Sequence, residues 1–211
     1  MHKVRLKLLL ALCFASSTAV FSGPISIVNI DTSSLSGTSG AIYFQFAGGL
    51  NPDPASVSIS NFSLDAPGAL DPAVPGTNPL TDGGVTGSLL ALPLIIDNSG
   101  GLNDYTHFLT FGSQISFQVS LNFPNPLVGD SGSDFLFAVT GPDGITPLLV
   151  SGPSDYFLGD IGYGLDGVVI ATALLPAAQI TSAVPEPSYG VGVFVALLAA
   201  FMLRRRKLAT S

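Results

Sequence analysis

The sequence predicts an all-β fold, a single antiparallel β-sandwich of jelly-roll type, and three observations favour it. The chain holds 24 Gly and 16 Pro, spread along its length, and these residues mark turns between short elements. Every Lys and Arg lies within residues 1–7 or 204–207, so the middle of the chain lacks the charged helix formers of a long surface helix. Between the turns, short runs alternate apolar and polar residues with the period of a strand.

Nine segments carry this strand pattern. The clearest covers residues 114–122 and places four apolar side chains on one face: Ile115, Phe117, Val119 and Leu121. The predicted strands are residues 25–30, 41–47, 56–64, 87–96, 105–111, 114–122, 134–140, 147–151 and 167–173. Their outward faces would carry Ser, Thr, Gln and Asn, and the aspartates would gather in the loops.

Charge in the middle of the chain has one sign. Residues 8–203 hold all thirteen Asp and the one Glu but no Lys or Arg, although the whole chain has a net charge of −7. A body without cations cannot neutralise phosphates, which excludes nucleic acid as a partner, and anionic lipid head groups repel it. Salt bridges cannot hold it together, so its stability must come from apolar burial and backbone hydrogen bonds.

Residues 1–22 predict a cleaved signal peptide. Three cations in the first seven residues precede an apolar run from Leu8 to about Ala15, and small residues allow cleavage after Ala19 or Ser22. The apolar run is too short to span about 30 Å of hydrocarbon. Cys13, the only cysteine, leaves a lipoprotein signal as an alternative, although a bulky leucine stands before it.

The C-terminal residues carry three features in a fixed order. They are the motif Val184, Pro185, Glu186 and Pro187, an uncharged run over residues 189–203, and the cluster Arg204, Arg205, Arg206 and Lys207. As a helix the uncharged run would reach about 22 Å. This length is short for a permanent span, but flanking arginines can snorkel and the bilayer can thin locally. The basic cluster would stay in the cytoplasm. The sequence thus predicts a short transmembrane helix that holds residues 23–183 outside the cell as an ectodomain.

This order of features resembles the PEP-CTERM sorting signal, over about residues 184–208. The resemblance implies that an integral-membrane exosortase with a catalytic cysteine recognises the motif and processes the tail. It also implies a Gram-negative host that makes exopolysaccharide. The protein would cross the inner membrane, stay anchored there transiently with its C-terminus in the cytoplasm, and then reach the cell surface or the medium. An ordinary tail anchor is the alternative.

The body also resembles a recurrent PEP-CTERM ectodomain type. Residues 28–40 followed by Ile42-x-Phe44-x-Phe46 match its opening, and the pair Asn103-Asp104 before Thr110-Phe111-Gly112 is similar to a later feature. This resemblance implies a shared β-fold over most of residues 24–183 and brings no activity with it.

Two groups of aspartates suggest a calcium site. Asp97, Asn98, Asn103 and Asp104 place four oxygen donors in one Gly-rich loop, and Asp155, Asp160 and Asp166 crowd a second region. Hard cations prefer such ligands. Neither stretch has EF-hand spacing, however, and solvated turns have the same composition. No other cofactor is expected.

A sugar-binding surface is a further hypothesis, because it would suit an exopolysaccharide-producing host. Sugar platforms use exposed aromatic side chains, and the body has no tryptophan. Tyr43, Tyr105, Tyr156 and Tyr163 are the candidates, without a spacing that singles out any of them.

Catalysis is not predicted. Gly129-Asp130-Ser131-Gly132 copies the nucleophile loop of chymotrypsin-like proteases, but the only histidine in the body is His107, 24 residues upstream. Residues 162–167 match Gly-x-Gly-x-x-Gly, yet a strand pattern follows where a dinucleotide site needs a helix.

The sequence therefore predicts a non-enzymatic exported protein of the cell surface or extracellular matrix. Its processing enzymes would be signal peptidase and exosortase, and exopolysaccharide is a candidate partner. The alternative is a carbohydrate- or calcium-binding β-sandwich module.

Overall fold

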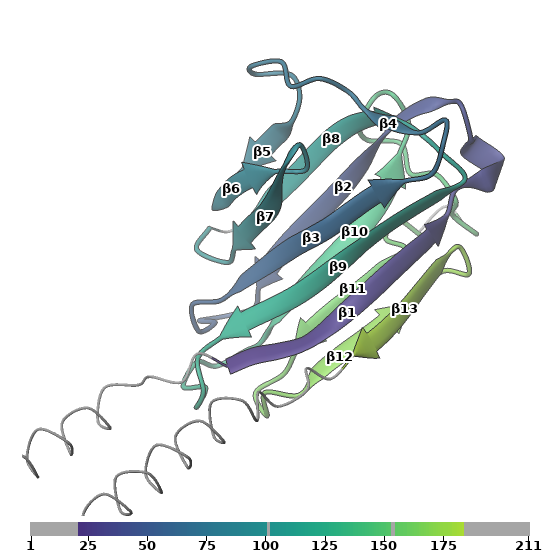
Figure 1. Cartoon of the computed structure of the whole chain (residues 1–211). Coiled ribbons are helices and arrows are strands. Elements are labelled where there is room, and N and C mark those ends of the chain that lie inside the picture. The colour runs from purple at the N-terminus through teal and green to yellow at the C-terminus, as the bar shows by residue number, and fades with distance from the viewer. Residues whose placement is uncertain (1–20, 101, 153–154, 184–211) are drawn as a thin grey trace, which may run out of the picture.

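The computed structural model describes residues 21–100, 102–152 and 155–183. These residues form two antiparallel sheets that lie face to face (Figure 1), which confirms the all-β prediction and agrees with a β-sandwich. Within the described ranges the only helical element is a 3-10 turn at Ser33–Leu35, and no helix is long and apolar enough to cross a membrane. The sorting motif, the uncharged run and the basic cluster lie outside the described residues, as does the signal peptide up to residue 20.

One sheet, called sheet A, contains six strands in the order β13-β1-β9-β3-β7-β6. Their bounds are β1 Phe21–Asp31, β3 Ser56–Leu64, β6 Val85–Ser88, β7 Ala91–Asp97, β9 Gln114–Phe123 and β13 Ala178–Ala183. The other, sheet B, has the order β12-β11-β10-β2-β8-β4, and β5 also pairs with β8. Its strands are β2 Ser39–Gly48, β4 Ala69–Leu70, β5 Leu80–Asp82, β8 Asp104–Thr110, β10 Ser133–Thr140, β11 Gly159–Tyr163 and β12 Val169–Ala173.

The first and last described strands are neighbours. β1 and β13 run antiparallel with Ile25 opposite Ala183, so the chain enters and leaves the sandwich at the same end. We call this end the terminal pole. The strand pairings place four connections there, residues 49–55, 98–103, 124–132 and 164–168. The connections 32–38, 111–113 and 174–177 lie at the opposite end, the far pole.

Aromatic side chains fill the space between the sheets. The ring of Phe44 on β2 packs at 5.2 Å from Phe117 on β9 and at 5.5 Å from Phe135 on β10, and Phe117 lies 5.5 Å from Phe137. All four rings are fully buried. The predicted alternation of residues 114–122 is confirmed, since its four apolar side chains are all in this core. Burial of such rings is the main source of stability in a body without ion pairs.

Two predicted strands are wrong. Residues 87–96 form a hairpin of β6 and β7 instead of one strand, because Gly87 has a positive φ of 82° and the chain turns at Leu89 and Leu90. Residues 147–151 form no strand, and only an isolated bridge between Thr140 and Pro147 is present there. Apolar runs beside Pro or Gly carry the strand pattern without its geometry.

The short strands β4 and β5 were not predicted, and neither were β11 and β13. β11 contains Gly159 and Gly162, residues that suggest a turn. Here each glycine makes room for a neighbour, because a Cβ at Gly159 would overlap the Phe137 ring and one at Gly162 would overlap the Asp134 carboxylate. The strand therefore needs glycine for packing across the sheet. β12 follows the Gly-x-Gly-x-x-Gly run, as predicted, and the two strands form a hairpin.

Candidate functional site

Three aromatic rings gather on the outer face of sheet B. Strand β2 alternates, so Phe44 and its inward neighbours enter the core while Tyr43 points outward. The connection between β10 and β11 brings Tyr156 and Phe157 over this face. The ring of Tyr43 lies 5.9 Å from Tyr156, edge to face, and 6.3 Å from Phe157, stacked; Tyr156 and Phe157 are 5.0 Å apart. We call these three residues the aromatic cluster, and all three are partly exposed.

Polar groups flank the aromatic cluster. The hydroxyl of Tyr43 donates a hydrogen bond of 3.0 Å to the Asp104 carboxylate, and Gln45 lies opposite Asp104 in the strand register. Burial and the Asp104 charge raise the pKa of Tyr43, so its hydroxyl stays protonated. Burial also raises the pKa of Asp104. An apolar platform beside an amide and a carboxylate is suited to a ligand that presents C–H faces and hydroxyls together.

The structure separates the four candidate tyrosines into two pairs. Tyr43 and Tyr156 belong to the aromatic cluster. Tyr105 and Tyr163 are core residues, and they are buried at the ends of β8 and β11. The sequence could not make this distinction, because Tyr156 reaches Tyr43 through a long connection that carries no strand pattern.

A pair of aspartates lies on the same face of sheet B. Asp134 on β10 is opposite Gly162, and Asp160 on β11 is opposite Leu136. Together with Tyr163, Ile170 and Thr172 they line a hollow of about 240 Å³. Burial, and then the Asp134 charge, raise the pKa of Asp160 to about 6, and its buried Oδ1 has no hydrogen-bond partner among the residues that the structure describes. This pair was not predicted, because its members are far apart in the sequence.

Both asparagines of the predicted calcium loop are used by the fold. Oδ1 of Asn98 accepts the N–H of Ala55 at 2.9 Å, and its Nδ2 donates to the Asp53 carbonyl and to Ser133 Oγ. Oδ1 of Asn103 accepts the N–H groups of Gly84 and Gly100, and its Nδ2 donates to the carbonyls of Phe46 and Gly100. Both side chains are buried. Their oxygens therefore already serve as acceptors that tie neighbouring loops together.

The two aspartates of that loop point to different partners. Oδ1 of Asp97 accepts the N–H of Ser99 within the turn, whereas Asp104 bonds Tyr43 on the outer face of sheet B. In the second region Asp166 caps its own turn by accepting the Val168 N–H, and Asp160 lies beside Asp134. Within the described ranges no three His, Cys, Asp or Glu side chains are arranged to hold a metal.

His107 is a core residue with both ring nitrogens bonded. Its Nε2 lies 3.0 Å from the Asp71 carbonyl, which can only accept, so Nε2 carries the proton. Nδ1 then accepts from the Tyr105 hydroxyl at 2.8 Å, and that hydroxyl accepts the Leu89 N–H.

Ser131, the serine of the protease-like loop, is not bonded to His107. Its hydroxyl donates to the backbone carbonyl of Leu50 at the terminal pole.

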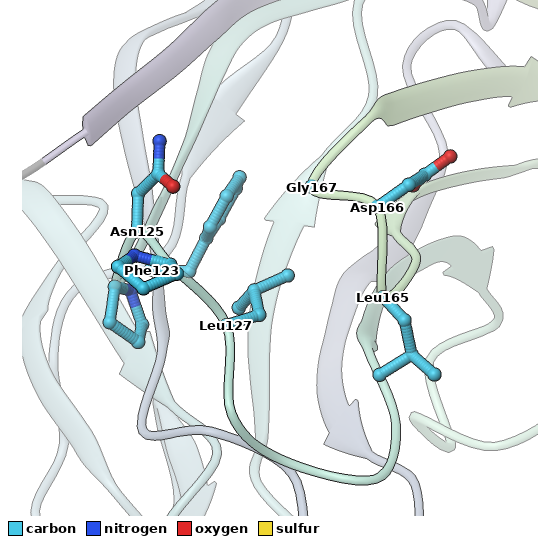
Figure 2. Close-up of a pocket in the computed structure, with 8 residues that line it drawn as sticks. Phe123, Asn125, Leu127, Leu165, Asp166 and Gly167 are labelled. Carbon is cyan, nitrogen blue, oxygen red and sulfur yellow. The ribbon is translucent and has the colours of Figure 1, made fainter.

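A second hollow, of about 380 Å³, opens at the terminal pole. Figure 2 shows Phe123, Asn125 and Leu127 on one side of it and residues 165–167 on the other. The ring of Phe123 stacks on Tyr163 at 4.2 Å and joins the hollow to the core. Two loops distant in the sequence, 124–132 and 164–168, thus lie side by side.

Comparison with protein-family models, curated proteins and solved structures gives no match to any of the three.

Proposed function

We propose that this chain is an exported, non-catalytic β-sandwich protein of the cell surface or extracellular matrix, sorted by its C-terminal residues as a PEP-CTERM protein. The observation that carries the proposal is the order of the motif 184–187, the uncharged run 189–203 and the basic cluster 204–207. The pairing of Ile25 with Ala183 supports it, because a signal peptide and a tail then leave the body at one pole. The remaining surface is free to face outward.

Three features support a role without catalysis. His107 is buried with both ring nitrogens engaged, so it cannot act as a base for Ser131. Ser131 bonds a backbone carbonyl. The Gly-x-Gly-x-x-Gly run forms a β-hairpin instead of the strand–helix turn that binds a pyrophosphate.

The sorting proposal is tested by substitution in the motif. In a Gram-negative host with an exosortase, Glu186→Ala, or removal of residues 204–207, should leave unprocessed protein in the inner-membrane fraction. Asp155→Ala, which removes an acidic side chain from the body, is the control and should be processed normally. Tail processing and localisation that are the same in all three variants would refute the proposal.

Carbohydrate binding is the second candidate function, and the aromatic cluster favours it. Tyr43, Tyr156 and Phe157 lie together on an outer sheet face with Asp104 and Gln45 beside them. We expect Tyr156→Ala to weaken binding to exopolysaccharide purified from the host about tenfold or more. Phe62→Ala removes a partly exposed ring from sheet A and should leave the affinity unchanged. Equal affinities for the two variants would exclude the aromatic cluster as the sugar site.

A further inference from the structure

Four strongly exposed aliphatic side chains lie at the terminal pole, on three neighbouring loops. Leu50, which follows β2, is 78% exposed; Val128, between β9 and β10, is 84% exposed; Leu165 and Val168, between β11 and β12, are 59% and 53% exposed. We call these four residues the apolar rim. Exposed apolar residues that gather at one end of a molecule indicate a contact surface.

Hydrogen bonds fix the first two loops of the apolar rim together. The buried Asp53 carboxylate accepts the N–H groups of Val128 and Gly129 at 2.8 and 2.7 Å. The Ser131 hydroxyl donates to the Leu50 carbonyl at 2.9 Å. Leu50 and Val128 are thus presented by loops that hold each other in place.

The third loop adjoins them across the hollow of Figure 2. Residues 124–127 line one side of that hollow, and Leu165 lies on the other side. Phe123 also lines this hollow, and its ring stacks on the buried ring of Tyr163. The apolar rim therefore lies at the same end of the sandwich at which β13 ends.

We propose that the apolar rim rests on the lipid surface in which residues 189–203 are anchored. The proposal depends on the proposed tail anchor. Ala183 is the last residue of β13 and lies at the terminal pole. Only residues 184–188 separate it from the uncharged run, and five residues extend at most about 18 Å. The apolar rim is therefore held close to the head groups, whose layer is about 5–8 Å thick on each side.

A short tether explains why four side chains are enough. Contact between a tethered pole and its own membrane is intramolecular, and short linkers give effective concentrations of about millimolar. The exposed Asp130 and Asp166 lie on the same loops, and no Lys or Arg lies between residues 8 and 203 to offset them. Anionic lipid would oppose the contact, so the proposed partner surface is zwitterionic.

The test uses the full chain with Cys13→Ser, reconstituted into phosphatidylcholine vesicles that contain nitroxide-labelled phosphatidylcholine. A fluorophore is attached at Val128→Cys or, as a control, at Ile145→Cys; Ile145 is 71% exposed in the turn after β10 at the far pole. We expect nitroxide quenching to be at least about twofold stronger at position 128. Adding Leu165→Asp and Val168→Asp should reduce it to the level at position 145 while the protein still floats with the vesicles.

The outcomes separate this inference from the proposed anchor. Flotation with equal quenching at the two positions overturns the lipid contact and leaves the anchor standing. Failure to float overturns the anchor, and the contact with it. If the fluorophore at position 128 becomes protected as the protein concentration rises, and its quenching does not depend on the content of nitroxide lipid, the apolar rim contacts a second copy of the chain and the inference is overturned.

Discussion

The carboxylate of Asp160 lies beside that of Asp134 on the outer face of sheet B, and its Oδ1 is buried with no hydrogen-bond partner in the described part of the chain. Charge at this position is unfavourable for the fold, because desolvation and the neighbouring charge both oppose ionisation. A body with no cations has no partner to offer such a pair. Ionisation of this carboxylate therefore destabilises the folded state.

Stability should rise when Asp160 loses its charge. The pKa of Asp160 is raised to about 6 from an ordinary 3.8. The contribution of this group to the free energy of unfolding is therefore fully present below about pH 4 and is lost as the pH rises through 6. Asp160→Asn should raise the free energy of unfolding by about 1 kcal/mol at pH 7.5, a value reduced for solvent screening, and by almost nothing at pH 4. Urea denaturation at the two pH values measures this.

Asp143→Asn is the matched control, with the opposite sign. The Asp143 carboxylate accepts a hydrogen bond from the Thr146 hydroxyl and further bonds from the N–H groups of Ile145 and Thr146, and together they lower its pKa to about 2. Its loss should therefore lower stability at pH 7.5. A decrease in the urea midpoint for Asp160→Asn at that pH would contradict the assignment of the buried charge.

Acid should destabilise the core through His107. Burial lowers the pKa of this imidazole, and its Nδ1 is the acceptor for the Tyr105 hydroxyl. The resulting stability is complete above about pH 6.5 and is lost as the pH falls below that value. The glutamine of His107→Gln is neutral at every pH. The unfolding free energy of this variant should therefore fall less between pH 7 and pH 5 than that of the parent protein. The comparison is best made in the Asp160→Asn background, because Asp160 titrates in the opposite direction. Equal slopes in the two proteins would contradict the prediction.

A substitution at Asn103 tests whether this side chain has a structural role or binds calcium. Asn103→Asp keeps an oxygen that accepts from Gly84 and Gly100 but cannot donate to the Phe46 carbonyl. If the side chain ties the loops together, the variant should be destabilised by about 1–3 kcal/mol, with or without calcium, because a buried acceptor loses its donor. Thermal melting in EDTA and in millimolar calcium checks this. Stabilisation of the variant by calcium beyond that of the parent would instead indicate a ligand role.

Signal-peptide cleavage should follow Ala19. β1 begins at Phe21, where Phe21 and Ser22 pair with Phe123 and Asn122 on β9. Cleavage after Ser22 would remove the first two residues of the strand, whereas cleavage after Ala19 leaves it whole. The mass of the exported protein should therefore correspond to an N-terminus at Val20. A mass that corresponds to an N-terminus at Gly23 would show that the mature fold does not need the pairs formed by Phe21 and Ser22.

Local patterns were enough to predict most of the long strands, but they missed strand β11 and did not predict the candidate sites. Residues 114–122 alternate because one face of β9 is core, and such a pattern is readable without any partner. By contrast β11 depends on Gly159 and Gly162, whose purpose appears only when Phe137 and Asp134 lie across from them. The calcium loop was predicted from composition, and composition cannot tell a free oxygen donor from one that, like Asn103, accepts two backbone N–H groups.

The aromatic cluster shows the same limit. Tyr43 could be predicted to point outward, since Phe44 must enter the core. Its contact with Tyr156 depends on how the connection after β10 returns over sheet B, which no short-range pattern encodes.

The position of β1 in sheet A determines the order in which the body can be completed. β1 has only β9 and β13 as neighbours in its sheet, and both come much later in the chain. While the polypeptide emerges from its N-terminus, the first strand stays unpaired until residues 114–123 arrive, and the sheet edge closes only with residues 178–183. Such long-range pairing makes folding slow. For the export proposed above, this order means that β1 lacks any partner in its sheet until residues 114–123 have followed it, and that its second neighbour is the last strand to arrive.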